Sequence, residues 1–131
     1  MIVEYVGLVE KVIDGYTLFF PDFPGCGSAG HNLEETRKNA REGLIAHIEL
    51  MLEDEQSIPK PASLDTIIKS PEAKDCIPLI IGIILPSGKA RRINITLDSE
   101  LLSAIDMLAA NQHKTRSSLL AEAAQQLLGT L

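Results

Sequence analysis

The chain has 131 residues, of which 45% are hydrophobic, 23% are charged and 4% are aromatic. This composition is ordinary for a globular protein with one modest domain or two small ones. With so few aromatic residues and no Trp, a base-stacking surface for single-stranded nucleic acid is not expected.

The net charge of −6 is unevenly spread along the chain. Residues 1–88 include 7 basic and 14 acidic residues, whereas residues 89–131 include 5 basic and 4 acidic residues. An acidic body is repelled by DNA and suits a basic protein partner, whereas a mildly basic tail can contact phosphates. The asymmetry predicts two domains with different tasks.

Two strands are predicted near the N-terminus, from Ile2 to Val9 and from Tyr16 to Phe20. Between them, Asp14-Gly15 favours the left-handed backbone of a tight hairpin turn. Residues 21–27 are then expected to leave the sheet, because Pro has no backbone N–H to donate to a neighbouring strand. A short third strand is expected from Gly27 to Ala29.

A long helix is predicted from Leu33 to about Glu53, with Asn32 as its cap. Leu64 to Ile68 predicts a short helical turn. The isoleucine-rich run from Ile77 to Leu85 predicts a buried strand in the centre of the sheet. The short linker at residues 86–89 should restrict the relative freedom of a domain at 1–85 and a domain at 90–131.

The second domain begins with a strict alternation of polar and apolar residues. Arg92, Asn94 and Thr96 fall on one face of a predicted strand, and the apolar residues between them fall on the other face. Arg suits guanine and Asn suits adenine in bidentate hydrogen bonds, and Thr can touch a thymine methyl group. This face is therefore predicted to contact bases of double-stranded DNA.

Two helices are predicted after this strand. Asp98 or Ser99 caps the first helix, and Thr115 caps the second, whose apolar stripe reaches Leu128. One strand and two helices in about 40 residues cannot close a core alone. A second copy is expected, so that two strands pair into an antiparallel ribbon that enters a major groove.

Residues 90–128 resemble the ribbon-helix-helix repressors of bacteria. The resemblance rests on the order of elements and on Thr115-Arg116-Ser117, which is similar to the Ser-Arg-Ser start of that family's second helix. It implies that Thr115, Arg116 and Ser117 hold the DNA backbone at a helix N-terminus. The alternative for the same residues is an edge strand and a helical hairpin without nucleic acid.

A second resemblance covers most of the first domain. Four short motifs occur in the order and at the spacing that are typical of HicB antitoxins. These motifs are Gly15-Tyr16, Pro21-Asp22-Phe23-Pro24-Gly25-Cys26, Leu33-Glu34-Glu35 and Ile58-Pro59-Lys60-Pro61. The resemblance implies an α+β fold, with a partial ribonuclease H-like domain followed by the ribbon-helix-helix domain. It also implies a partner, a HicA-like toxin that cleaves messenger RNA. One departure is Thr36-Arg37, where the family more often has Ala-Leu.

Catalysis is not expected from the candidate side chains. A two-metal hydrolase needs carboxylates that converge on ions about 4 Å apart. Turn formation and the first turn of a helix explain the available carboxylates more simply. These carboxylates are Asp14, Asp22, Glu34 and Glu35. Cys26 near His31 lacks the electropositive setting that a reactive thiol needs, and no metal site or cofactor is expected.

Asp22 and Phe23 leave two interpretations open. The Pro residues on either side fix the geometry of this turn. The turn could be purely structural, or it could be a rigid contact for the basic face of a toxin, where an acidic side chain mimics phosphate.

Together these features predict an antitoxin that binds a HicA-like toxin, represses its own operon at an operator DNA, and forms a homodimer or higher oligomer. It is not expected to be an enzyme. Without a signal peptide or an apolar run of membrane length, it is expected in the cytoplasm and not at a membrane. Two alternatives remain, an RNA hydrolase that uses the acidic domain and a repressor whose first domain senses a small molecule.

Overall fold

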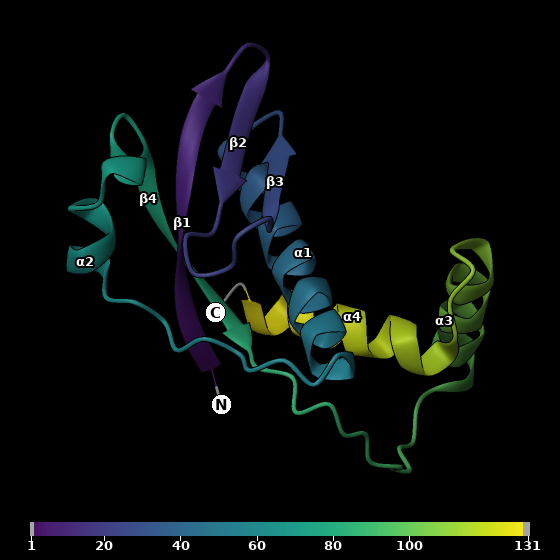
Figure 1. Cartoon of the computed structure of the whole chain (residues 1–131). Coiled ribbons are helices and arrows are strands. Elements are labelled where there is room, and N and C mark those ends of the chain that lie inside the picture. The colour runs from purple at the N-terminus through teal and green to yellow at the C-terminus, as the bar shows by residue number, and fades with distance from the viewer. Residues whose placement is uncertain (1, 130–131) are drawn as a thin grey trace. The chain divides into compact units, whose positions relative to one another are not determined.

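The computed structural model describes residues 2–129 and divides the chain into two compact units. Unit 1 comprises residues 1–89 and contains a sheet with one long helix, whereas unit 2 comprises residues 90–131 and contains two helices (Figure 1). Among residues 2–129, no helix combines the length and the apolar character needed to cross a bilayer.

Unit 1 is built on a four-stranded antiparallel sheet in the order β3-β2-β1-β4. Its strands are β1 (Ile2–Val12), β2 (Gly15–Phe19), β3 (Gly27–Gly30) and β4 (Ile77–Ile84). β1 and β2 form the predicted hairpin, in which Asp14 has a left-handed φ of 65°. Gly15 begins β2, and a Cβ atom there would lie 2.3 Å from the carbonyl oxygen of Gly30. The close approach of β3 therefore requires Gly at this position.

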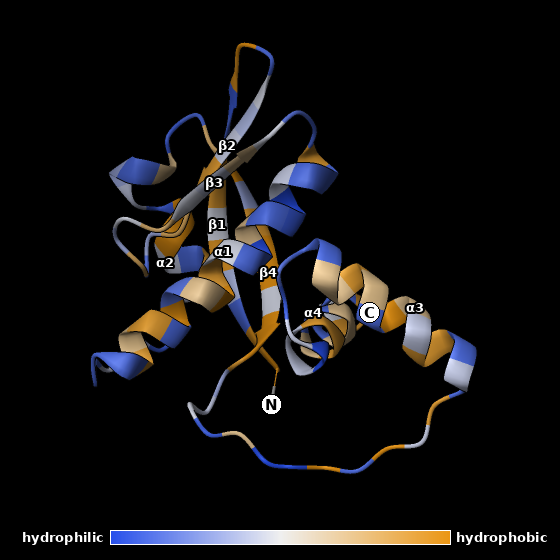
Figure 2. Cartoon of the chain, turned by 90° about the vertical axis from the view of Figure 1, so that its right-hand side faces the viewer, coloured by the Kyte–Doolittle hydropathy of each residue, from blue (hydrophilic) through white to orange (hydrophobic). Residues whose placement is uncertain are grey.

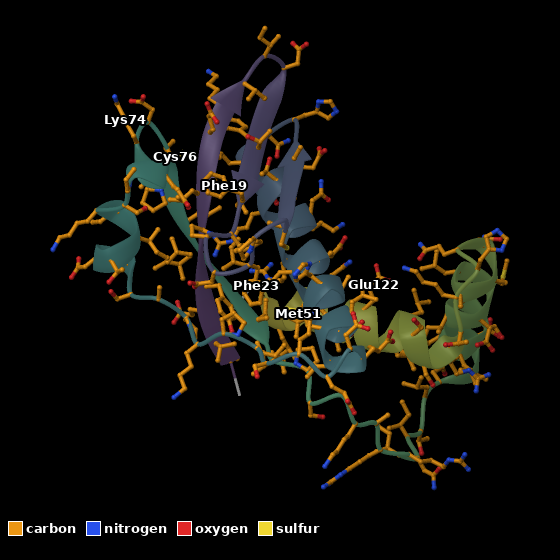
Figure 3. All side chains as sticks on the ribbon, viewed as in Figure 1. Phe19, Phe23, Met51, Lys74, Cys76 and Glu122 are labelled. Atoms are coloured by element: carbon orange, nitrogen blue, oxygen red, sulfur yellow. The ribbon has the colours of Figure 1, made fainter. Side chains whose placement is uncertain are left out.

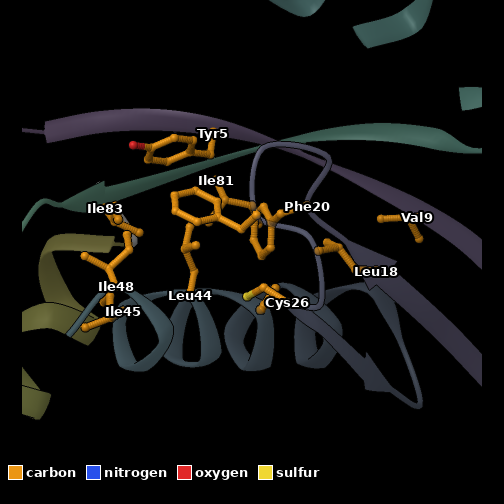
Figure 4. Packing of buried hydrophobic residues seen from close by; sticks show 12 residues of the cluster. Tyr5, Val9, Leu18, Phe20, Cys26, Leu44, Ile45, Ile48, Ile81 and Ile83 are labelled. Atoms are coloured by element: carbon orange, nitrogen blue, oxygen red, sulfur yellow. The ribbon is translucent and has the colours of Figure 1, made fainter. Parts of the chain in front are cut away.

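One face of the sheet is covered by α1 (Leu33–Glu53), whose limits match the predicted helix. The Asn32 side chain accepts a hydrogen bond from the Glu35 amide at 2.8 Å and so caps α1 as expected. Apolar side chains from α1 and the strands interlock to form the main core (Figure 4). Burial of this cluster is the main source of stability for unit 1.

The opposite face of the sheet is partly covered by α2 (Leu64–Ile68) and the 3₁₀ helix η1 (Pro71–Ala73). Ile67 of α2 packs there on Val6 and Leu8 of β1. Half-buried Phe19 and Cys76, both labelled in Figure 3, border this second cluster. The sheet is therefore covered more completely on the α1 face than on the opposite face.

β4 lies at an edge of the sheet, so the prediction that it is central was wrong. The hairpin places β2 on one side of β1, and β4 pairs with the other side. Among residues 2–129 no strand lies beyond β4. The isoleucines of β4 are split between the two faces. Ile81 and Ile83 are buried on the α1 face, whereas Ile80 on the opposite face is 40% exposed. The isoleucine-rich sequence of β4 therefore does not mean that both faces of this strand are buried.

Unit 2 contains α3 (Ser99–Asn111) and α4 (Arg116–Gly129), close to the predicted helices. Asp98 caps α3, and the Thr115 hydroxyl accepts a hydrogen bond from the Ser118 amide at 3.1 Å. Ala109 and Leu119 are buried. Several larger apolar side chains are more than half exposed, namely Leu101, Met107 and Leu127. Two helices bury too little surface to form a complete core.

Residues 85–98 belong to no helix or strand, so the strand predicted at Arg92–Leu97 is not formed in the single chain. A strand needs a hydrogen-bonded neighbour, and among residues 2–129 this segment pairs with no strand. Ile93 and Ile95 are consequently 72% and 59% exposed. Figure 2 shows hydrophobic and hydrophilic residues alternating along this segment.

Candidate partner-binding and DNA-binding sites

The turn at residues 20–26 is held by its own backbone. The Phe20 amide donates to the Cys26 carbonyl at 3.2 Å, and the amides of Phe23 and Cys26 donate to the carbonyls of Phe20 and Phe23, each at 3.0 Å. Gly25 adopts a left-handed φ of 86°, which a side chain would strain. The turn therefore has one fixed geometry.

Asp22 ties this turn to a distant part of the chain. Its Oδ2 accepts a hydrogen bond from the Ala62 amide at 3.1 Å, and the Tyr5 hydroxyl donates to the Pro59 carbonyl at 2.7 Å. Burial, and to a lesser extent the charge of Asp22, raises the pKa of Tyr5. The phenol therefore stays protonated and keeps its bond. Together the two bonds anchor the segment that follows α1.

Phe23 is 1% exposed, so its ring does not provide the exposed contact that one of the two interpretations of this turn required. Its ring packs edge-on against Tyr5, Phe20 and His47, with centroid distances of 4.8, 6.5 and 5.9 Å. The turn folds back onto the core because burying an aromatic ring of this size is strongly favourable. Of the two interpretations of this turn, the structural one accounts for Phe23.

Both cysteines lie in settings that favour the protonated thiol. Burial raises the pKa of the Cys26 thiol, which favours the unreactive protonated form. His31 is exposed, and its Nδ1 lies 3.4 Å from the Asp14 carbonyl in the hairpin turn. Cys76 donates a weak hydrogen bond to the Glu72 carbonyl, and burial raises its pKa as well.

The carboxylates considered for metal binding are scattered over separate elements. Asp14 lies in the hairpin turn, Asp22 is bonded to Ala62, and Glu34 and Glu35 lie in the first turn of α1. Among residues 2–129, no three His, Cys, Asp or Glu side chains gather closely enough to hold a metal ion.

Arg37, at the departure from the family pattern, contacts the sheet edge. Its Nη2 donates to the Ile80 carbonyl at 3.0 Å, and Arg41 Nε donates to the Gly82 carbonyl at 3.1 Å. Both acceptors belong to β4. The sequence reasoning missed this pair, although a spacing of four residues in a helix does indicate that the two side chains share a face.

The predicted base-contacting residues Arg92, Asn94 and Thr96 are all exposed. They lie in the segment that forms no strand in the single chain, so nothing within the described residues orders them into one face. Their spacing still places them on one face whenever the segment becomes extended and paired.

The start of α4 contains the three predicted backbone-contacting residues, and all three are exposed. Thr115 caps the helix, and Ser117 lies in its first turn. Arg116 forms a bidentate pair with Asp106 of α3, with both N–O distances at 2.9 Å. This bonding lowers the pKa of the Asp106 carboxyl. Lys114 pairs with Glu122, so two ion pairs connect the two helices and the turn between them.

Comparison with known proteins agrees with this architecture. Residues 5–124 match the family described as the HicB-like antitoxin of bacterial toxin-antitoxin systems. A 14.9 kDa protein of Haemophilus phage HP1, from the rep-hol intergenic region, is 43% identical over 124 residues, which are 92% of this chain and 93% of that protein.

Two solved structures are also similar. The crystal structure of the Burkholderia pseudomallei antitoxin HicB is 28% identical with a TM-score of 0.57, and the match covers 96% of each chain. A chain of the HicA3 and HicB3 toxin-antitoxin complex is 29% identical with a TM-score of 0.51, over 63% of this chain and 94% of that one. Because the family match reaches from unit 1 into unit 2, the chain belongs to the HicB-like antitoxins of bacterial toxin-antitoxin systems.

Proposed function

We propose that this chain neutralises a HicA-like toxin by binding it through unit 1 and represses its own operon by binding operator DNA through unit 2. The family match over residues 5–124 carries the proposal. A similar antitoxin occurs in the HicA3 and HicB3 complex, which supports a toxin as the partner. In this proposal the chain is not an enzyme, and it acts by covering the toxin.

The charge distribution supports this division of tasks. Residues 1–88 hold 14 acidic and 7 basic residues, which suits a basic protein that itself binds RNA. Residues 89–131 hold 5 basic and 4 acidic residues. Unit 2 is therefore the part that DNA repels least.

DNA binding requires a second copy of unit 2. Pairing of two copies would give the segment at residues 92–97 the neighbour that it lacks, and it would cover Ile93 and Ile95. Arg92, Asn94 and Thr96 would then share the opposite face of an antiparallel ribbon and reach base edges in the major groove. The exposed apolar side chains of α3 and α4 support the same dimer.

Thr115, Arg116 and Ser117 would hold the DNA backbone at the N-terminus of α4. Asp106 occupies two N–H groups of Arg116, and the other guanidinium donors remain available to a phosphate. The ion pair would thus orient Arg116 toward the DNA. Each phosphate contact contributes about 0.9 to the magnitude of the slope of log affinity against log salt concentration. Because a symmetric dimer loses the contact twice, Arg116→Ala should reduce that magnitude by about 1.8.

The proposal is tested by co-expressing the full chain with the HicA-like protein encoded beside it. Growth should resume when the chain is present, and the purified chain should retard the promoter DNA of its own operon in a gel-shift assay. Persistent growth arrest with a folded, soluble chain would contradict the antitoxin role. Loss of RNA on incubation with the purified chain and Mg²⁺ would instead support the RNA hydrolase.

A further inference from the structure

The sheet of unit 1 has a region that remains uncovered by the described residues of the unit. α2 and η1 cover the middle of the face opposite α1, over Val6 and Leu8. Beyond them, Ile2 is 63% exposed and Ile80 is 40% exposed, whereas Ile84 is half-buried. These isoleucines belong to β1 and β4, which are adjacent strands.

Strand register brings these side chains together. Ile2 pairs with Ile84, Glu4 with Gly82, and Val6 with Ile80. Partners in an antiparallel pair point to the same face of the sheet. A Cβ atom on Gly82 would lie 3.6 Å from Ile2 Cγ2 and 3.9 Å from Glu4 Cγ, so both side chains lie over this glycine. We call Ile2, Glu4, Ile80, Gly82 and Ile84 the open sheet face.

A partner cannot easily reach the open sheet face by adding a strand to β4. Arg37 and Arg41 occupy the carbonyls of Ile80 and Gly82, which point away from β1. Pro78 lies two residues before Ile80 on the same edge and has no amide to donate. Because this edge is closed, a partner must bind through side chains against the face itself.

Glu4 indicates which kind of partner fits. It is exposed between Ile2 and Val6 along the same face of β1, and it lies within an otherwise apolar surface. Two copies that paired through this face would bury two carboxylates near each other, which is unfavourable. A partner that places Lys or Arg against Glu4, with apolar side chains around it, would satisfy both features.

We infer that the open sheet face binds the toxin, with a basic residue of the toxin paired to Glu4. This inference rests on the proposed function and replaces the buried Phe23 as the location of the contact. The three isoleucines form the apolar centre of the interface, and Glu4 supplies its charged contact.

The test compares full-length variants in toxin binding and in rescue of growth, using the HicA-like protein encoded beside this chain. Glu4→Lys and Ile2→Asp change exposed side chains, so the fold should persist, as circular dichroism can verify. Each should weaken toxin binding on the order of 100-fold and abolish rescue. Glu49→Lys, which changes the same charge on the exposed side of α1, is the matched control and should behave as the wild type.

The outcomes separate the possibilities. Wild-type binding by both Glu4→Lys and Ile2→Asp would overturn the inference and leave the antitoxin role intact. Equal loss in Glu49→Lys would also overturn it, because the effect would then reflect net charge alone. If Glu4→Gln raised the oligomer mass in light scattering, the face would pair two copies and the inference would be wrong. Failure of the wild-type chain to bind would overturn the proposed function itself.

Discussion

Thr36 shows at the scale of one residue how a departure from the family pattern is accommodated. Its side chain is fully buried, and its hydroxyl donates to the Asn32 carbonyl at 2.8 Å. Ser28 donates to the carbonyl of Thr36 at 3.2 Å. A buried hydroxyl with a partner costs little free energy. The helix and β3 approach closely at this point because Gly30 lacks a side chain, and a Cβ atom there would lie 2.6 Å from the Thr36 nitrogen.

Gly30→Ala is therefore expected to lower the free energy of unfolding by about 1–3 kcal/mol, because the added methyl group forces β3 away from α1. Urea denaturation followed by circular dichroism measures this change. Gly82→Ala is the matched control, since a Cβ atom there would meet its nearest neighbour at 3.6 Å, an ordinary contact. Similar losses of stability in both variants would contradict the close-packing argument.

Cys26 and Tyr5 should make stability fall at alkaline pH. Burial raises the pKa of the Cys26 thiol and that of the Tyr5 phenol above their ordinary values. Each group then holds its proton more tightly in the folded chain, so its contribution is complete below the unfolded pKa and is lost as pH rises through the folded pKa. The urea midpoint should decrease above about pH 9, and Cys26→Ala should make the decrease shallower. An equally steep decrease in the variant would exclude the thiol as its source.

At the scale of elements, α1 closes both edges of the sheet. Arg37 and Arg41 donate to carbonyls of β4, and on the other side of the helix Asn39 Nδ2 donates to the Ala29 carbonyl of β3 at 2.9 Å. Unpaired groups on an edge strand promote pairing between molecules. The limits and cap of α1 were predictable because they depend on neighbouring residues. The contacts of Arg37 and Arg41 were not, because they join residues 43 and 41 positions apart.

Replacing both Arg37 and Arg41 by Ala should expose the carbonyls of an isoleucine-rich edge and promote association between sheets. Size-exclusion chromatography over a concentration series should show larger species than in the wild type. Lys38→Ala removes a neighbouring positive charge and is the control, since this side chain is exposed and has no role at the edge. An unchanged elution profile for the double variant would show that the two arginines are not needed to prevent association through the β4 edge.

For the whole molecule, the sequence predicted local features better than distant ones. α1, α2, α3 and α4 were predicted near their observed positions because caps and apolar spacing are local. The edge position of β4, the burial of Phe23 and the pairing of Arg116 with Asp106 depend on contacts between distant residues or elements. The strand predicted at residues 92–97 is not formed in the single chain, and in the proposed function it forms only when a second chain pairs with it.

The strand pairing proposed for unit 2 can be tested separately from toxin binding by unit 1. Ile95→Asp places a charge where two strands should pair, so it should give a monomer in light scattering and abolish operator binding. Asn94 lies on the opposite face of the proposed strand, so Asn94→Ala should remain a dimer but lose its preference for the operator. Each base contact is worth roughly 1–3 kcal/mol of discrimination, and a symmetric dimer loses it twice. Both variants should still rescue growth, because unit 1 is unchanged. A dimeric Ile95→Asp variant with intact operator binding would exclude the paired strands as the DNA-binding element.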